Sequence, residues 1–130
     1  MNIRTGLILA AMAAGLATPA LAAEGDIAAG EKVFNKCKAC HQVGEGAKNR
    51  VGPVLNGVIG RPIASIEDFR YSDAFVAKRE EGFVWTEETF HDYIGDPKAY
   101  IPGNKMAFAG LRKEEDIQNV LAYLEANAAE

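Results

Sequence analysis

Hydrophobic residues recur with the period of an α-helix near both ends of the chain. Close to the C-terminus they follow the spacing i, i+3, i+4 and i+7 of one buried helix face, at Ile117, Val120, Leu121 and Leu124. The acidic residues 114–116 lie just before them, where negative charge stabilises the first turn of a helix. Toward the other end, Asp26 can cap a helix whose inner face carries Ile27, Gly30, Val33, Phe34 and Cys37.

Shorter helices are predicted between these two. Their start and stop signals are, in chain order, Ser72 to Gly82, Thr86 to Gly95, and Asp96-Pro97 to Pro102-Gly103. No alternating run of apolar and polar residues is long enough to predict a strand. The stretch 42–70 is rich in glycine and proline and is expected to be loop. The pattern therefore favours an all-α domain with long connections.

Residues 1–22 have the pattern of a cleaved secretory signal. Arg4 is their only charge, and a mostly apolar, uncharged run follows it. The segment closes with Ala20-Leu21-Ala22, the small-x-small pattern that signal peptidase cuts. The apolar run is shorter than the ~20 residues that a membrane-spanning helix needs, and an uncleaved anchor is the alternative. We expect residues 23–130 to form the mature domain and to work in the periplasm of a Gram-negative host.

Composition excludes several classes of protein. The 130 residues are 48% hydrophobic and 25% charged, as expected for one compact domain. Acidic residues outnumber basic ones, 18 to 14, which argues against a dedicated nucleic-acid binder. Two cysteines are too few for a disulfide-dense scaffold. Short helices around glycine-rich loops would bury little apolar surface, so a group other than side chains is expected to fill the interior.

Residues 37–41, Cys-Lys-Ala-Cys-His, form the C-x-x-C-H signature of c-type haem attachment. Two thiols about one helical turn apart can add to the two vinyl groups of a porphyrin, and the following imidazole can then bind the iron. A thioredoxin-like site would need an alternating α/β pattern, and a zinc site would want four ligands, for which the chain offers only its two Cys and two His. We predict one haem c, attached through Cys37 and Cys40, with His41 as an axial ligand.

The residues alone leave the second axial ligand open. Met106 lies in a loop that Pro102-Gly103 makes rigid, although most methionines are ordinary packed side chains. His91 is another candidate, but it lies off the apolar face of its predicted helix, where a histidine is usually solvated. A vacant or water-filled site is the third possibility. A His/Met pair would raise the reduction potential and leave no open site for oxygen or peroxide.

The chain resembles the class I cytochromes c, both the mitochondrial proteins and the bacterial cytochromes c2. The resemblance runs from about residue 25 to 126 and rests on Gly30 with Phe34, residues 37–41, Gly52-Pro53, Leu55, Gly57, Gly60-Arg61, Tyr71-Ser72-Asp73-Ala74, Trp85-Thr86-Glu87-Glu88-Thr89, Asp96-Pro97-Lys98, Tyr100-Ile101-Pro102-Gly103, Lys105-Met106 and Leu121-Ala122-Tyr123-Leu124. It implies an all-α class I cytochrome c fold, with about five short helices and long loops wrapped around one covalent haem. It also implies that the first helix crosses the last, with Gly30 and Phe34 against Val120 and Tyr123.

The resemblance implies how the iron is held. Met106 becomes the second axial ligand, and the Pro53 carbonyl accepts the other ring N–H of His41. Tyr93 directs its hydroxyl at the sulfur of Met106.

The resemblance also implies the surroundings of the haem. Arg61, Tyr71 and Trp85 face the propionates, whose charge is costly to bury without partners. Phe108 covers the distal haem edge. Asn104 stands in the haem environment, where the mitochondrial proteins usually have threonine, and the segment 75–82 is longer than theirs.

Charged residues are unevenly divided along the chain. Two stretches, 36–50 and 98–113, are rich in basic residues and nearly free of acidic ones, whereas acidic residues prevail between 63 and 92. The basic residues are Lys36, Lys38, Lys48, Arg50, Lys98, Lys105, Arg112 and Lys113. By the family resemblance both stretches border the exposed haem edge. A basic rim at that place would steer docking to acidic partner surfaces.

These features predict a soluble, monomeric periplasmic cytochrome c that shuttles single electrons. The expected partners are a cytochrome bc1-type complex and either a terminal oxidase or a photosynthetic reaction centre, all bound transiently. No enzymatic activity, nucleic-acid binding or stable membrane insertion is expected. One alternative is a ligand-binding haem sensor or peroxidase in which Met106 does not hold the iron. Another is a carrier tethered to the membrane by its retained N-terminal segment.

Overall fold

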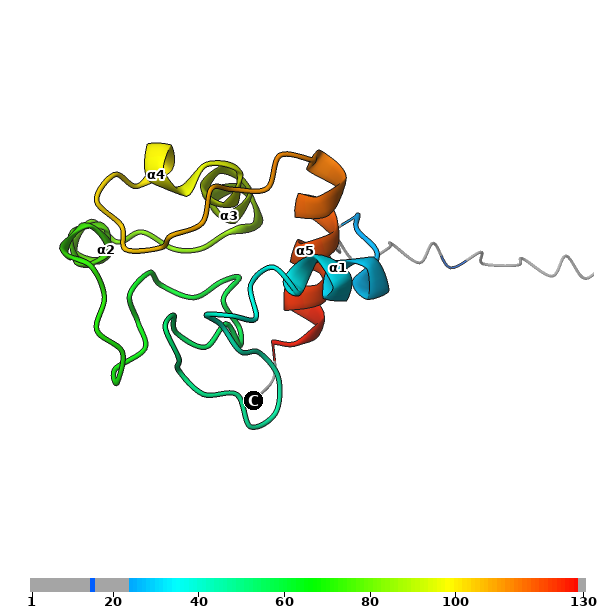
Figure 1. Ribbon diagram of the computed structural model, residues 1–130, viewed down its shortest axis with the longest axis horizontal. Coiled ribbons are helices and arrows are strands. Elements are labelled where there is room, and N and C mark those ends of the chain that lie inside the picture. Colours follow the sequence, from blue (N-terminus) through cyan, green and yellow to red (C-terminus); the bar gives the residue numbers. More distant parts are fainter. Residues whose placement is uncertain (1–14, 16–23, 129–130) are drawn as a thin grey trace, which may run out of the picture.

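The computed structural model describes residues 15 and 24–128. Its helices are α1 (Ile27–Phe34), α2 (Asp73–Glu80), α3 (Glu87–Gly95), α4 (Pro97–Tyr100) and α5 (Glu114–Ala126), joined by long loops (Figure 1). An isolated antiparallel bridge pairs Pro62 with Val84. The expected all-α architecture is confirmed. The predicted signal segment and its cleavage site, residues 1–22, lie outside the described residues apart from residue 15.

Side-chain caps set the starts of α1, α2 and α3 at the predicted places. Asp26 caps α1 by accepting a hydrogen bond from the backbone of Ala29 at 2.8 Å. Ser72 caps α2, and Thr86 forms a capping box with Thr89 at the start of α3. These local hydrogen bonds satisfy backbone donors that a helix leaves without partners, which is why the boundaries can be predicted from sequence. Within the described ranges, no helix has the length and apolarity to cross a bilayer.

The terminal helices α1 and α5 cross where glycine removes a side chain (Figure 1). A Cβ atom on Gly30 would lie 1.9 Å from the carbonyl oxygen of Asn119, so the two backbones touch at this point. The rings of Phe34 and Tyr123 pack beside the crossing with centroids 5.3 Å apart. The predicted crossing is confirmed. One detail was wrong: Ile27, expected on the inner face, is 54% exposed because α1 turns this first residue away from α5.

The rest of the chain is arranged in two parts on one side of this helix pair. The loop from residue 35 to 72 forms one part, and α3, α4 and the segment 101–113 form the part opposite it (Figure 1). The buried core draws on both, with Val58 and Ile63 from the first and Phe90, Ile94 and Ile101 from the second. His41 therefore belongs to one part, and Met106 to the other.

Candidate functional site

The C-x-x-C-H segment forms a single turn directly after α1. The backbone N–H groups of Cys40 and His41 donate to the carbonyl of Cys37 at 3.1 and 2.8 Å. Both thiols are half-buried, and burial raises the pKa of the Cys37 thiol to about 11, although Lys36 opposes the shift. Such a thiol is protonated at neutral pH, whereas redox-active C-x-x-C sites depend on a thiolate. The turn therefore lacks the lowered thiol pKa on which a thiol–disulfide exchange site depends.

The imidazole of His41 is held in one orientation. Its Nδ1 lies 2.8 Å from the carbonyl oxygen of Pro53. Because a carbonyl only accepts, Nδ1 carries the proton and Nε2 is left with a lone pair for a metal. A Cβ on Gly52 would lie 2.2 Å from the ring, so the imidazole packs against bare backbone. Burial lowers the pKa of His41, which favours the neutral, metal-binding form; the Pro53 hydrogen bond opposes this shift and Arg61 adds to it.

Met106 lies beside a buried phenol. The hydroxyl of Tyr93 donates to its sulfur over 3.6 Å. Tyr93 is 5% exposed, and burial raises its pKa far above the ordinary range, so the phenol keeps its proton at any physiological pH. The sulfur is thus in contact with a permanent hydrogen-bond donor.

Asn104 positions the loop that carries Met106. Its amide nitrogen donates to the carbonyls of Pro97 and Ile101, both at 2.8 Å, and its amide oxygen accepts from the backbone N–H of Met106 at 2.8 Å. Both amide hydrogens are therefore used inside the loop. The side chain stands near the expected site, but its hydrogen bonds fix the backbone of Met106 and leave no amide donor for a propionate.

Arg61 lies half-buried on the other part of the fold. Its Nη1 donates to the carbonyls of Val54 and Asn56 at 3.0 and 3.1 Å, and its Nε is buried without a protein partner. Its backbone carbonyl accepts from the backbone N–H of Trp85 at 3.0 Å, across the bridge that joins Pro62 to Val84. The hydroxyl of Tyr71 accepts from the backbone of Ile66 at 3.2 Å, which leaves its own hydrogen to donate elsewhere. Arg61 and Tyr71 thus each keep a hydrogen-bond donor that is not used within the protein.

An aromatic cluster links the two parts. The rings of Trp85 and Tyr93 have centroids 4.9 Å apart. Phe75 contacts Tyr71, Trp85 and Tyr93 with centroid separations of 5.9 to 6.1 Å. The sequence does not reveal this role of Phe75, because its helix has only a weak apolar pattern. Phe108 is partly buried against the same core.

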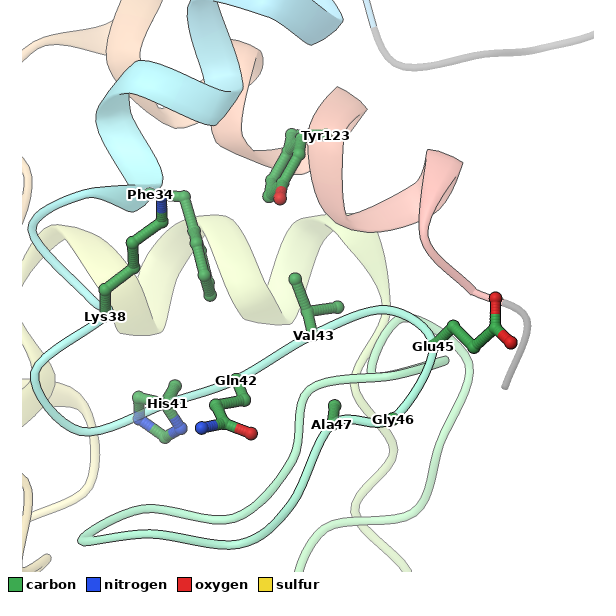
Figure 2. Close-up of a pocket in the computed structure, with 9 residues that line it drawn as sticks. All are labelled: Phe34, Lys38, His41, Gln42, Val43, Glu45, Gly46, Ala47 and Tyr123. Atoms are coloured by element: carbon green, nitrogen blue, oxygen red, sulfur yellow. The ribbon is translucent and has the colours of Figure 1, made fainter.

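A pocket of about 330 Å³ opens next to His41. The rings of Phe34 and Tyr123 reach toward it from α1 and α5, and His41 and Gln42 lie on the loop across from them (Figure 2). The pocket exposes one side of the C-x-x-C-H turn at the surface.

The arrangement fits a covalently attached haem. It offers two thiols one turn apart, an imidazole nitrogen and a thioether, which are the donors that c-type haem requires. The buried polar atoms without a protein hydrogen-bond partner include Arg61 Nε and Ser65 Oγ, as expected beside a group with carboxylates. Among residues 15 and 24–128, no group of three or more His, Cys, Asp or Glu could hold a metal ion directly.

His91 lies away from this arrangement. Both of its ring nitrogens have partners, Glu114 at 2.7 Å from Nε2 and Asp92 at 3.2 Å from Nδ1. It therefore acts as a link between α3 and α5, which argues against the alternative that made it an iron ligand.

The basic residues singled out in the sequence are exposed, all eight of them: Lys36, Lys38, Lys48, Arg50, Lys98, Lys105, Arg112 and Lys113. In the part of the chain that the structure describes, the ion pairs within 4.0 Å are formed by Lys78, Arg79 and His91, and not by these eight residues. Their charge is accordingly available to a partner surface.

Known proteins resemble this chain over most of its length. Residues 27–128 match the family model described as cytochrome c. The chain is 56% identical over 98 residues to a cytochrome c2 of Afifella marina, which covers 75% of this chain and 79% of that protein. It is 56% identical over 119 residues to cytochrome c-554 of Methylosinus trichosporium, with 91% and 88% covered. The solved structure of cytochrome c2 from Rhodospirillum centenum has a TM-score of 0.76 at 39% identity and covers 81% of this chain and 100% of that one.

Proposed function

The chain belongs to the cytochrome c family, as a class I c-type cytochrome with one covalently bound haem c, and we propose that it carries single electrons through a His41/Met106-ligated iron. Like the cytochromes c2 it resembles, it is an electron carrier and not an enzyme. The bound haem supplies a one-electron couple at its iron. The chain's own residues hold that group, exclude water and present it to partners.

The observation that carries this proposal is the contact between Tyr93 and Met106. A hydroxyl 3.6 Å from the sulfur, buried and permanently protonated, orients the thioether and keeps it from turning away. Asn104 adds a second restraint by holding the backbone N–H of the same residue. A thioether restrained in this way is suited to act as a fixed ligand, and a fully ligated iron has no position for oxygen or peroxide.

The other ligand is proposed to be His41. Its Nδ1–H donates to Pro53, so its Nε2 is the ligating atom and the ring plane is set by the backbone. Cys37 and Cys40 are proposed to form the two thioether links. With both links and the imidazole in one turn, the group is held at three points by five residues of chain.

Arg61, Tyr71 and Trp85 are proposed to bind the propionates, and Phe108 to shield the distal edge. Arg61 Nε and the Tyr71 hydroxyl hydrogen have no protein acceptor, so a carboxylate there would complete their hydrogen bonds. Burying that charge beside a guanidinium reduces its desolvation cost.

The proposed partners are a cytochrome bc1-type complex as donor and a terminal oxidase or photosynthetic reaction centre as acceptor. The eight exposed basic residues would meet acidic surfaces on these complexes. Docking of this kind is fast because opposite fields steer the encounter, and weak because exposed charge pairs add little affinity. A monomeric carrier that must dissociate after each electron needs both properties.

The proposed location is the periplasm, reached by removal of residues 1–22. Intact mass of the protein purified from its host tests this. Loss of residues 1–22 with gain of one haem supports a soluble domain of residues 23–130, whereas the full chain plus one haem would mean a tethered carrier.

Visible spectra test the proposed ligation. The oxidised and dithionite-reduced protein should be low-spin, should show a weak far-red methionine–iron band when oxidised, and should not respond to carbon monoxide. A high-spin spectrum that shifts with carbon monoxide would assign the protein to ligand sensing or peroxide chemistry instead.

A further inference from the structure

The hydroxyl of Ser65 is an isolated polar atom inside the protein. Its Oγ has no hydrogen-bond partner and less than 1 Å² of accessible surface. A buried hydroxyl without a partner destabilises the fold relative to one that is hydrogen-bonded. Only a few such atoms are expected in a native protein, and a partner outside the chain is one explanation for such an atom.

The backbone on both sides of Ser65 is anchored. The carbonyl of Ala64 accepts from Arg79 Nη1 at 3.1 Å, and the N–H of Ile66 donates to the Tyr71 hydroxyl at 3.2 Å. Ala64 itself has a left-handed backbone (φ 55°), a conformation that alanine adopts only when its surroundings impose it. The segment is therefore held in place at a local cost, and the hydroxyl of Ser65 is held with it.

The charges around this segment favour an anion. Burial is the main cause that raises the pKa of Tyr71; the nearby Arg61 and Arg79 lower this pKa and Asp68 raises it, so two cations and one anion act on the phenol. Arg61 also has its buried Nε without a partner. The charged groups that act on the Tyr71 phenol are thus two guanidinium groups and one carboxylate.

We propose that Ser65 is a further positioning residue, whose hydroxyl donates to the same haem carboxylate that Arg61 and Tyr71 bind. This inference rests on the proposed propionate site of Arg61 and Tyr71. The Arg61 Nε–H, the Tyr71 hydroxyl and the Ser65 hydroxyl supply donors that the two oxygens of one carboxylate can accept. Hydrogen bonds to the ionised form keep its pKa low, so Ser65 helps to hold the propionate charged.

The reduction potential reports on this carboxylate. A negative charge near the iron stabilises the oxidised state, so the potential falls as the propionate loses its proton. Loss of one hydrogen bond to an ionised group should raise the proton affinity of the carboxylate about tenfold. In Ser65→Ala, the pH at which the potential begins to fall should therefore move up by about one unit. Ser65→Thr keeps a hydroxyl and should keep the wild-type profile.

The experiment is a potentiometric titration of the haem-loaded protein over a range of pH. Ser65→Gly is a second variant without the hydroxyl, in case Ser65→Ala does not fold. Thr86→Ala is the matched control, because it removes a helix cap and should lower the melting temperature without moving the pH profile.

Arg61→Leu separates failure of this inference from failure of the proposed propionate site. If Arg61→Leu moves the profile and both hydroxyl-free variants do not, Ser65 binds water or nothing and the inference is overturned, while the propionate site stands. If none of the three moves the profile, the propionate is not bound at Arg61, and the proposed propionate site falls together with this inference.

Discussion

The hydroxyl of Tyr93 lies 3.6 Å from the sulfur of Met106 and donates to it. The two residues are on different segments, α3 and the loop after α4, and their contact joins the aromatic cluster to the proposed ligand. A thioether that accepts a hydrogen bond is a weaker electron donor to iron, so this contact should favour the reduced state.

Tyr93→Phe should accordingly lower the reduction potential. The expected fall is on the order of tens of millivolts, since one hydrogen bond contributes about 1 kcal/mol and about 59 mV corresponds to a tenfold change for one electron. Phe75→Leu, which alters the same cluster without touching the sulfur, is the control. An unchanged potential in Tyr93→Phe would mean that the hydroxyl does not influence the iron.

Met106→Ala should remove one of the two proposed protein ligands of the iron. We expect a high-spin spectrum, binding of carbon monoxide and a potential lower by on the order of a hundred millivolts or more, because thioether ligation raises the potential. Lys105→Ala, one residue earlier in the same exposed loop, should keep the low-spin spectrum. If Met106→Ala shows an unchanged potential and no carbon monoxide binding, another residue is the ligand.

Charge reversal should slow docking. For the double variant Lys38→Glu/Lys105→Glu, we expect the rate constant for oxidation by host membranes to fall about tenfold at low ionic strength. At high ionic strength the variant and the wild type should converge, because salt screens exposed charges. Lys78→Glu is the control, since Lys78 pairs with Glu81 within the acidic stretch. If the variant and the wild type are oxidised at equal rates at low ionic strength, Lys38 and Lys105 do not contribute to docking.

Gly30→Val should disrupt the crossing of α1 and α5. Any Cβ at this position meets the backbone of Asn119 at 1.9 Å, and backbone cannot move aside as a side chain can. We expect a loss of about 3 kcal/mol or more in the free energy of unfolding, measured by denaturant titration of the haem-loaded protein. Gly95→Ala, whose Cβ has open space, should change it by less than about 1 kcal/mol.

His91 should make stability depend on pH. Hydrogen bonds from its ring to Glu114, and then to Asp92, raise its pKa above the ordinary 6.5. A raised pKa in the folded state means that the contact stabilises the fold below the ordinary pKa and is lost as the pH rises through the folded pKa. The difference in melting temperature between wild type and His91→Gln should therefore be largest in mildly acidic solution and vanish in alkaline solution. It should shrink again in strong acid, where Glu114, whose pKa is lowered, takes up its proton.

Glu87→Gln is the control for this pH dependence, because Glu87 is exposed in the first turn of the same helix. A pH-independent difference between wild type and His91→Gln would mean that the ring contributes by packing alone.

The helices and the attachment motif could be predicted from the sequence because their causes are local. Asp26, Ser72 and Thr86 each satisfy backbone donors within three residues of themselves. The turn at residues 37–41 is likewise held by backbone hydrogen bonds between residues close in sequence. The resemblance added Pro53 and Tyr93 as partners of His41 and Met106, which neither periodicity nor spacing could supply.

Only the tertiary structure decided which side chains meet across the fold. Phe75 packs against the rings of Tyr71, Trp85 and Tyr93. The amide group of Asn104 makes its hydrogen bonds within the Met106 loop, and the Ser65 hydroxyl is buried without a partner. Each of these depends on where long loops run, and a loop takes its path from contacts with residues distant in sequence. Hydrogen bonds in a helix cap are determined within one turn, whereas those in a loop are determined by the whole packed interior.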